Sequence, residues 1–390
     1  MKSLLLLPGP VPVAQPVLEA MARPMINHRG PEFAEIIARI ERGLRPVFGT
    51  KGDVVLLGSS GTGAMEAAFV NLFSPGDVVL SCPIGVFGKR FALIAQSYGC
   101  IVETLDTPAG AALDAHALRA RLKTDTAKRI AGVLLTHNET STGVQNDMAA
   151  IADAVREHGA VTLVDSISGL GASDFRMDEW GYDVVVTASQ KAFAAPPGIA
   201  MFAASDRGWE RMERSSVPRF YFDARKAREF AKTGQTPWTP PISILYALDV
   251  ALARYHADGM EAVVERHARY AQAVRAALEA LGFVIFSRPD AHSVTVVAAY
   301  PPEGVEAAKF LKRLRERYGV VLSGGQGELS GKIIRFGTMG DVTEGDIIGA
   351  IGSIELTLAD LDAPSSPGAG TRAAVEALSH REPVLSLSKG

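Results

Sequence analysis

The sequence contains only two cysteines among its 390 residues, Cys82 and Cys100, and neither belongs to a C-x-x-C motif. This pattern speaks against a disulfide framework and against a structural zinc site, so we expect no bound metal and two buried thiols in a reducing compartment. The sequence also lacks an excess of either charge, since its formal net charge is −3. Nothing therefore indicates nucleic acid or an anionic membrane surface as a partner, and a small molecule is the default ligand.

Long hydrophobic runs are missing as well. Four leucines stand at the start of the chain, but Pro8-Gly9-Pro10 interrupts them, and the apolar segment of a signal peptide is longer. No run of about 18 apolar residues occurs that could cross a membrane, so we expect a cytoplasmic protein. The same proline-rich segment cannot form a helix or a central strand, which predicts an extended arm over the body or over a partner.

Short apolar runs alternate with amphipathic segments from Val54 to about residue 203, which is typical of an α/β sheet. Strand and helix patterns between 283 and 361 follow an α+β layout. The length suffices for two domains. We therefore predict an N-terminal arm (1–20), a large domain (21–258), a smaller C-terminal domain (259–362) and, because Pro, Ser and Gly follow Ala363, a disordered tail (363–390).

Lys191 is the first candidate for chemistry. It follows the apolar run Val184–Ala188, and desolvation at the end of a buried strand lowers the pKa of an amine and makes it a nucleophile toward aldehydes. Asp165 ends a second apolar run, and the carboxyl ends of parallel strands meet at one edge of a sheet. An acid there could hold the protonated ring nitrogen of pyridoxal 5′-phosphate while Lys191 holds its aldehyde as a Schiff base. The competing interpretation is a solvated surface lysine.

A glycine-rich turn joins the strand 54–57 to the apolar helix that begins at Ala64. The free amides and the dipole of a helix start attract anions, so Ser60, Gly61 and Thr62 are predicted to hold a phosphate. The phosphate of a nucleotide could bind to these amides for the same reason. The dinucleotide pattern G-x-G-x-x-G is absent, however, because Glu66 stands at its third glycine.

Several segments together resemble the class V aminotransferases of fold type I, in particular the alanine–glyoxylate and serine–pyruvate group. The resemblance extends over about residues 4–361, and its motifs fall in the family's order: Pro8–Pro10, His137–Gly143, Val164–Gly171, Ser189–Ala192 and Pro196–Gly198. It implies a large domain with a mostly parallel sheet flanked by helices, a smaller C-terminal α+β domain, pyridoxal 5′-phosphate as cofactor, and a homodimer.

The resemblance also implies roles for individual residues. It places the ring of Phe87 on the cofactor and the hydroxyl of Thr140 at the ring hydroxyl, and it adds Gln190 to the cofactor contacts. Thr239 would reach the phosphate from the other subunit, and Arg335 would grip the substrate carboxylate at two points. A core phenylalanine and an edge-strand arginine paired to a surface acid are the alternatives for Phe87 and Arg335.

The reaction implied is transamination of a small amino acid, alanine or serine, with glyoxylate or pyruvate as acceptor. Aspartate or 2-aminoethylphosphonate as donor, and a lyase or desulfurase on the same scaffold, are the alternatives. A desulfurase needs a nucleophilic cysteine in the C-terminal half, where neither Cys82 nor Cys100 lies. A non-catalytic binding protein would leave Lys191 and Asp165 without a purpose. His28 and Arg29 lie in a loop, and their contact with substrate stays open.

Overall fold

A computed structural model describes residues 3–364 and 366–380 of the chain. Its main sheet has seven strands, and only β10 runs antiparallel to its two neighbours, which confirms the mostly parallel sheet predicted for the large domain. The strands lie in the order β2 (Asp53–Gly58), β10 (Ile199–Ala204), β9 (Val184–Ala188), β8 (Val161–Asp165), β5 (Ile130–Thr136), β3 (Val78–Ser81) and β4 (Ile101–Thr104).

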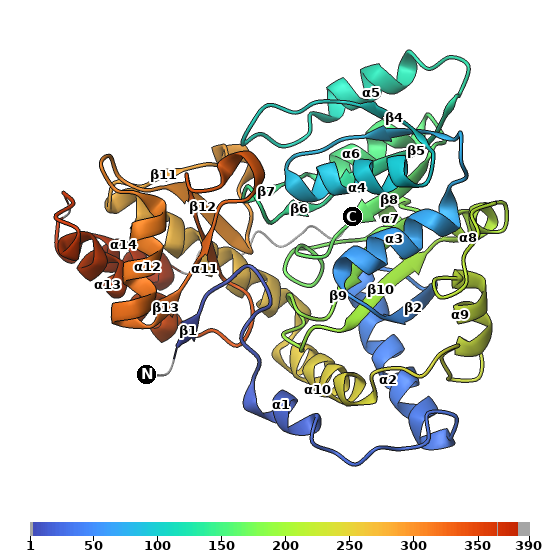
Figure 1. Ribbon diagram of the computed structural model, residues 1–390, viewed down its shortest axis with the longest axis horizontal. Coiled ribbons are helices and arrows are strands. Elements are labelled where there is room, and N and C mark those ends of the chain that lie inside the picture. Colours follow the sequence, from blue (N-terminus) through green and yellow to red (C-terminus); the bar gives the residue numbers. More distant parts are fainter. Residues whose placement is uncertain (1–2, 365, 381–390) are drawn as a thin grey trace.

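Helices cover both faces of this sheet (Figure 1). Because strand side chains alternate between faces, Val185 joins one hydrophobic core while Val184 and Val186 join the other. The first core is completed by α2 (Pro31–Phe48), α5 (Ala115–Lys123), α6 (Met148–Arg156), α7 (Met177–Trp180) and α10 (Ile242–Asp258), and the second by α3 (Gly61–Leu72), α4 (Val86–Ser97), α8 (Asp206–Met212) and α9 (Ala224–Ala231). None of the described helices is both long and apolar enough to cross a membrane.

A second, antiparallel sheet lies in the C-terminal part of the chain (Figure 1). It has its own hydrophobic core. The boundary predicted after residue 258 falls between α10 and the next helix, α11. The sheet order is β11 (Val284–Ile285), β12 (Val296–Tyr300), β15 (Ile334–Gly337) and β14 (Ser323–Gly324), and the helices are α11 (Met260–Ala280), α12 (Ala307–Tyr318) and α13 (Glu344–Asp360).

The prediction of a disordered tail from residue 363 is wrong for helix α14 (Ala369–Ser379). This helix packs against α11 and buries Ala374 and Leu378, which stand four residues apart and therefore on one helix face. The carboxylate of Glu355 accepts hydrogen bonds from the amides of Gly368 and Thr371 at the start of the helix. Composition predicted disorder because polar and small residues surround this apolar pair. Residues 381–390 lie outside the described part.

The N-terminal arm joins the two parts of the molecule. Strand β1 (Leu4–Leu5) pairs with β13 (Val320–Val321), and Leu6 is fully buried in the C-terminal core. The arm then passes to the large domain, where helix α1 (Gln15–Ala20) packs on α10 (Figure 1). The segment between them crosses the edge of the seven-stranded sheet at which the candidate site lies.

Candidate active site

A pocket lies at the edge of the large sheet where β2, β5, β8 and β9 end. Every cofactor-binding residue predicted from the sequence lines this pocket, with the exception of Thr239. Four further residues complete the wall. Its members are Ser60, Gly61, Thr62, Phe87, Arg90, Asn138, Thr140, Asp165, Ile167, Ser168, Gln190 and Lys191.

Lys191 lines the pocket, and its side chain comes from the loop after β9. The residue is only 9% exposed, and its Nζ donates a hydrogen bond to the carbonyl oxygen of Pro8 at 2.6 Å. Burial lowers the pKa of the amine to about 8, although the nearby charge of Asp165 opposes this shift. An amine with this pKa has an appreciable neutral, nucleophilic fraction near neutral pH.

Asp165 ends β8 and is buried beside the lysine. Burial raises the pKa of its carboxyl group to about 7, and the hydrogen bond from the amide of Ile167 to Oδ1 (2.9 Å) acts in the opposite direction. The charges of Lys191 and Arg90 also lower this pKa, whereas that of Glu139 raises it. A cation placed against Asp165 would therefore hold it in its ionised form.

The start of α3 forms one wall of the pocket. Ser60 is its N-cap, and the side-chain oxygen accepts from the amide of Gly63 at 3.3 Å. The amides of Gly61 and Thr62 are the first two of the helix, where backbone donors have no partner within the helix. Gly61 packs closely against Ile167, since a Cβ there would lie 2.8 Å from Cδ1 of that side chain and would force it to shift. This wall is chemically suited to an anion.

Phe87 and Arg90 extend into the pocket from α4. Phe87 is partly buried and lines the pocket, so the alternative of a core phenylalanine is wrong. The carboxylate of Glu139 fixes the start of this helix, because it accepts hydrogen bonds from the amides of Phe87 (3.0 Å) and Gly88 (3.1 Å). Sequence reasoning missed Arg90, although it follows Phe87 by three residues and so lies on the same helix face.

Arg335 reaches the site from β15 and is only 6% exposed. Its Nη1 donates to the carbonyl oxygen of Thr140 at 3.0 Å, and its Nε donates to that of Gly324 at 2.8 Å. No carboxylate of the described residues forms an ion pair with it, so the alternative of an arginine paired to a surface acid is wrong. Burial lowers the pKa of the guanidinium, and the charge of Glu139 opposes this.

Asn138 and Ser168 belong to a buried hydrogen-bond network that sequence reasoning did not assign. The Nδ2 of Asn138 donates to the hydroxyl oxygens of Ser168 (2.8 Å) and Thr295 (2.9 Å), and Thr140 Oγ1 also donates to Ser168 (2.8 Å). Within the described residues, Asn138 Oδ1 and Gln190 Oε1 are buried without a hydrogen-bond partner. Unpartnered acceptors in a pocket wall indicate that the pocket is built for a ligand with donors.

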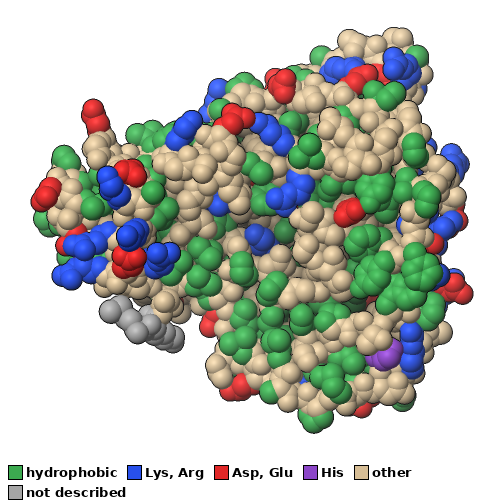
Figure 2. Space-filling model, viewed as in Figure 1, with side chains coloured by type: hydrophobic (Ala, Val, Ile, Leu, Met, Phe, Trp, Pro, Cys, Tyr) green, Lys and Arg blue, Asp and Glu red, His purple; other side chains and the backbone are tan. Residues whose placement is uncertain are grey.

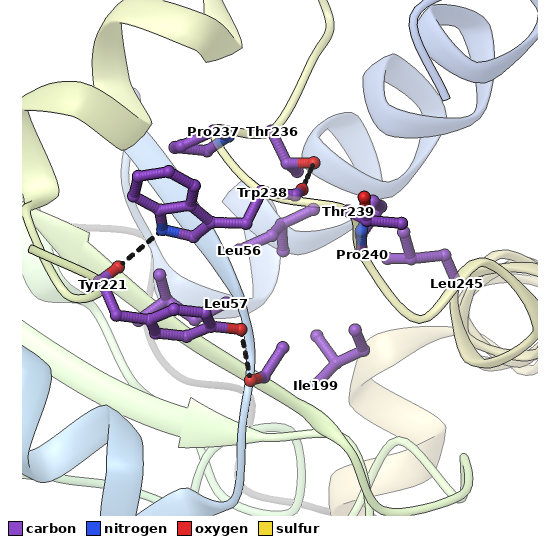
Figure 3. A pocket seen from close by; sticks show the side chains of 11 residues that line it. Leu56, Leu57, Ile199, Tyr221, Thr236, Pro237, Trp238, Thr239, Pro240 and Leu245 are labelled. Atoms are coloured by element: carbon purple, nitrogen blue, oxygen red, sulfur yellow. Dashed lines mark hydrogen bonds between the residues drawn. The ribbon is translucent and has the colours of Figure 1, made fainter. Parts of the chain in front are cut away.

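Thr239 lies apart from these residues. It is exposed on the loop before α10, beside a second groove that is lined by Leu56, Leu57 and Tyr221 (Figure 3). Arg29 holds this loop in place, because its guanidinium donates to the carbonyl oxygens of Thr236 (2.6 Å) and Pro237 (3.2 Å). Within one chain, neither Thr239 nor Arg29 lines the lysine pocket.

The surface beside Thr239 is rich in exposed aromatic side chains. Phe220 is 70% exposed, and its ring stacks on that of Trp238 at 4.7 Å between centroids. The indole Nε1 of Trp238 donates to the carbonyl oxygen of Tyr221 at 3.0 Å (Figure 3). Figure 2 shows hydrophobic side chains gathered on this side of the large domain.

The described residues contain no group of three or more His, Cys, Asp or Glu side chains that could hold a metal ion. The acids and amides of the pocket are instead spread over several strand ends.

Known proteins match this sequence over nearly the whole chain. The family model "Aminotransferase class-V" matches residues 16–336. The chain is 40% identical to a protein named soluble hydrogenase, small subunit, of Synechococcus sp., over 97% of this chain and 99% of the relative. It is 38% identical to an L-aspartate–glyoxylate aminotransferase of Paracoccus denitrificans, over 95% and 94%. The crystal structure of an alanine–glyoxylate aminotransferase from Nostoc sp. matches with a TM-score of 0.88 and 31% identity, over 92% and 96%. This chain belongs to the class V aminotransferases.

Proposed function

We propose that this protein binds pyridoxal 5′-phosphate and transfers the amino group of alanine or serine to glyoxylate or pyruvate, working as a cytoplasmic homodimer. The observation that carries the proposal is that a buried amine, Lys191, and a buried carboxyl group, Asp165, line one pocket, while a buried guanidinium, Arg335, is hydrogen-bonded to the pocket residue Thr140. Three buried ionisable groups without a mutual ion pair are costly for stability, and such groups gather where chemistry requires them.

The pocket fits this cofactor at each of its polar positions. Lys191 would hold the aldehyde, Asp165 the protonated ring nitrogen, and the start of α3 at Ser60–Thr62 the phosphate. Phe87 would lie against the ring. The unpartnered oxygens of Asn138 and Gln190 offer acceptors to donors of the bound molecules.

The bound cofactor supplies an electron-withdrawing ring that stabilises negative charge developing at the substrate Cα. Asp165 would hold a proton at the ring nitrogen of the bound cofactor, and the positive charge of that nitrogen would keep the Asp165 carboxylate ionised. Lys191 Nζ takes the proton from the substrate Cα, for which its depressed pKa suits it. Arg335 orients the substrate through its carboxylate, and burial of the pocket strengthens that contact by excluding water.

The charge pattern favours a small donor. Arg335 can hold one carboxylate, but the second carboxylate of aspartate or glutamate needs another cation when it leaves water. Besides Lys191, the pocket wall holds the cation Arg90, whose hydrogen bond goes to Thr62 at the helix start. The relative named L-aspartate–glyoxylate aminotransferase makes aspartate the strongest competing donor.

A panel of amino acids offered to the purified protein with glyoxylate or pyruvate tests this function, with the 2-oxo acid products as the readout. We expect alanine and serine to give the largest kcat/KM, aspartate to be poor, and Lys191→Ala to be inactive. Borohydride should also fix the cofactor covalently to Lys191 in the yellow protein. Turnover of no donor, or a protein that stays colourless with excess cofactor, would contradict the proposal.

The homodimer is supported by the surface around Thr239. Exposed aromatic side chains beside a loop that carries a candidate phosphate ligand are better explained by a covering partner than by solvent. In a dimer, Thr239 would reach the other subunit's pocket, and Arg29 would hold its loop in place. Sedimentation of the active protein should therefore report a dimer, and a strictly monomeric active enzyme would remove Thr239 from the site.

A further inference from the structure

Arg90 is a cation in the wall of the active-site pocket that neither the motifs nor the proposed reaction employs. Its Nη1 donates to the hydroxyl oxygen of Thr62 at 2.8 Å. Its guanidinium also lies over the ring of Phe87, with 4.5 Å from Cζ to the centroid. One side chain thus connects the start of α3 with the aromatic wall on α4.

The charge of Arg90 has no ion-pair partner among the described residues. Glu139 accepts hydrogen bonds from the amides at the start of α4 and from Ser141. The charge of Arg90 lowers the pKa of Asp165, but no ion pair joins these two residues in the described structure. A guanidinium has five N–H donors, and one of them is used here. A partly buried arginine with spare donors at a pocket wall is suited to an anion.

The hydrogen bond to Thr62 indicates on which side of the pocket Arg90 would bind an anion. Because the oxygen of Thr62 accepts from Arg90, its own O–H can donate to a ligand, and the cation polarises it for that purpose. The free amides of Gly61 and Thr62 converge on the same place. The charge of Arg90, the hydroxyl of Thr62 and the amides at the start of α3 therefore converge on one anion site. Arg335 is separate from this site, because it belongs to β15 of the other domain.

We propose that Arg90 is a ligand of the anionic phosphate group of the cofactor, which it binds together with Thr62 and the first amides of α3. The proposal rests on the function argued above and deepens it. It also agrees with the proposed preference for small donors, since a cation engaged by phosphate cannot serve a distal substrate carboxylate.

Pyridoxal, which lacks the phosphate, separates this role from a structural one. Dissociation constants of pyridoxal 5′-phosphate and of pyridoxal are measured by absorbance or fluorescence with cofactor-free wild-type protein, Arg90→Gln, Arg90→Lys and Lys89→Gln. Lys89 is the matched control, because it lies one residue away on the same helix and pairs with Glu328 at the surface. Thermal unfolding in inorganic phosphate, a probe that needs no ring, is the second measurement.

We expect Arg90→Gln to weaken binding of pyridoxal 5′-phosphate by about 10- to 100-fold and that of pyridoxal by less than about 3-fold, because a charge-assisted contact to phosphate alone is lost. Arg90→Lys should recover part of the loss, Lys89→Gln should match wild type, and phosphate should stabilise wild type more than Arg90→Gln.

Equal losses for both ligands would overturn the proposal, because they would show that Arg90 acts through Phe87 or the fold. Unchanged cofactor affinity together with lost turnover of aspartate would overturn it in favour of a distal-carboxylate role. Wild-type protein that binds neither ligand would instead refute the proposed function.

Discussion

The contact between the N-terminal arm and Lys191 makes a specific prediction for Gly9→Ala. Gly9 has a φ of +133°, and an added Cβ would lie 2.8 Å from Cδ and Cε of Lys191 and closer still to Nζ. Real Cβ contacts are not this short, so either the lysine or the arm must shift. Because the lysine end is the flexible partner and the arm is anchored by β1 in the other domain, we expect the amine to move.

Two separate effects set the magnitude. The left-handed backbone at Gly9 is strained for alanine by about 1–3 kcal/mol, which lowers the free energy of unfolding. Relief of the contact moves Nζ by about 1 Å, and a misplacement of that size in a reacting group can cost about 100-fold in rate. Gly9→Ala should thus lose about two orders of magnitude in kcat while remaining folded.

Gly304→Ala is the matched control. Its φ of +82° also disfavours alanine, but no atom of the described residues lies within 4 Å of the added Cβ, so this variant should lose stability without losing activity. The assay compares kcat, the absorbance of bound cofactor and the thermal unfolding midpoint of both variants. If Gly9→Ala loses as much stability as Gly304→Ala but keeps the wild-type kcat, the arm does not pack on the reactive amine.

Further predictions concern pH, substrate grip and stability. The rate of cofactor uptake should increase as the pH rises to about 8 and then level off, because at pH 7 only about a tenth of the Lys191 amine is neutral. A rate that keeps increasing toward pH 10 would indicate that the pKa of Lys191 is not lowered. Arg335→Lys should lower kcat/KM of every donor by a similar factor, about 10–100-fold, since the two-point grip is lost whatever the side chain, and a donor-selective loss would contradict this. Leu378→Ala should lower the free energy of unfolding by about 2–5 kcal/mol, whereas the half-exposed Val375→Ala should change it little; equal small effects in chemical denaturation would mean that α14 is not docked.

Residues at strand ends and helix starts could be predicted from sequence because their signals are local. Lys191 and Asp165 each follow an apolar run, and parallel pairing brings both ends to one edge. The glycine-rich turn at Ser60–Thr62 likewise predicts the start of a helix. Where the pattern is local and periodic, sequence reasoning placed the residues of the pocket together.

Contacts between segments distant in sequence could not be predicted in this way. The hydrogen bond from Lys191 to Pro8 spans 183 residues, and no periodicity encodes it. Arg90 was missed because its partner Thr62 lies on another helix. The docking of α14 was missed because the prediction of disorder rested on the overall composition of the tail, which is polar. Packing on α11 depends only on the one helix face that carries Leu378.

The partners of the two cationic groups explain how the site keeps its charge available. Lys191 and Arg335 donate to backbone carbonyls, those of Pro8, Thr140 and Gly324, and neither contacts a carboxylate of the described residues. A neutral acceptor satisfies a donor without cancelling its charge, whereas an ion pair would raise the pKa of the amine and occupy the guanidinium. Burial therefore lowers the pKa of both groups. An incoming carboxylate then meets a cation that has already left bulk water, which is the condition under which the contact is strongest.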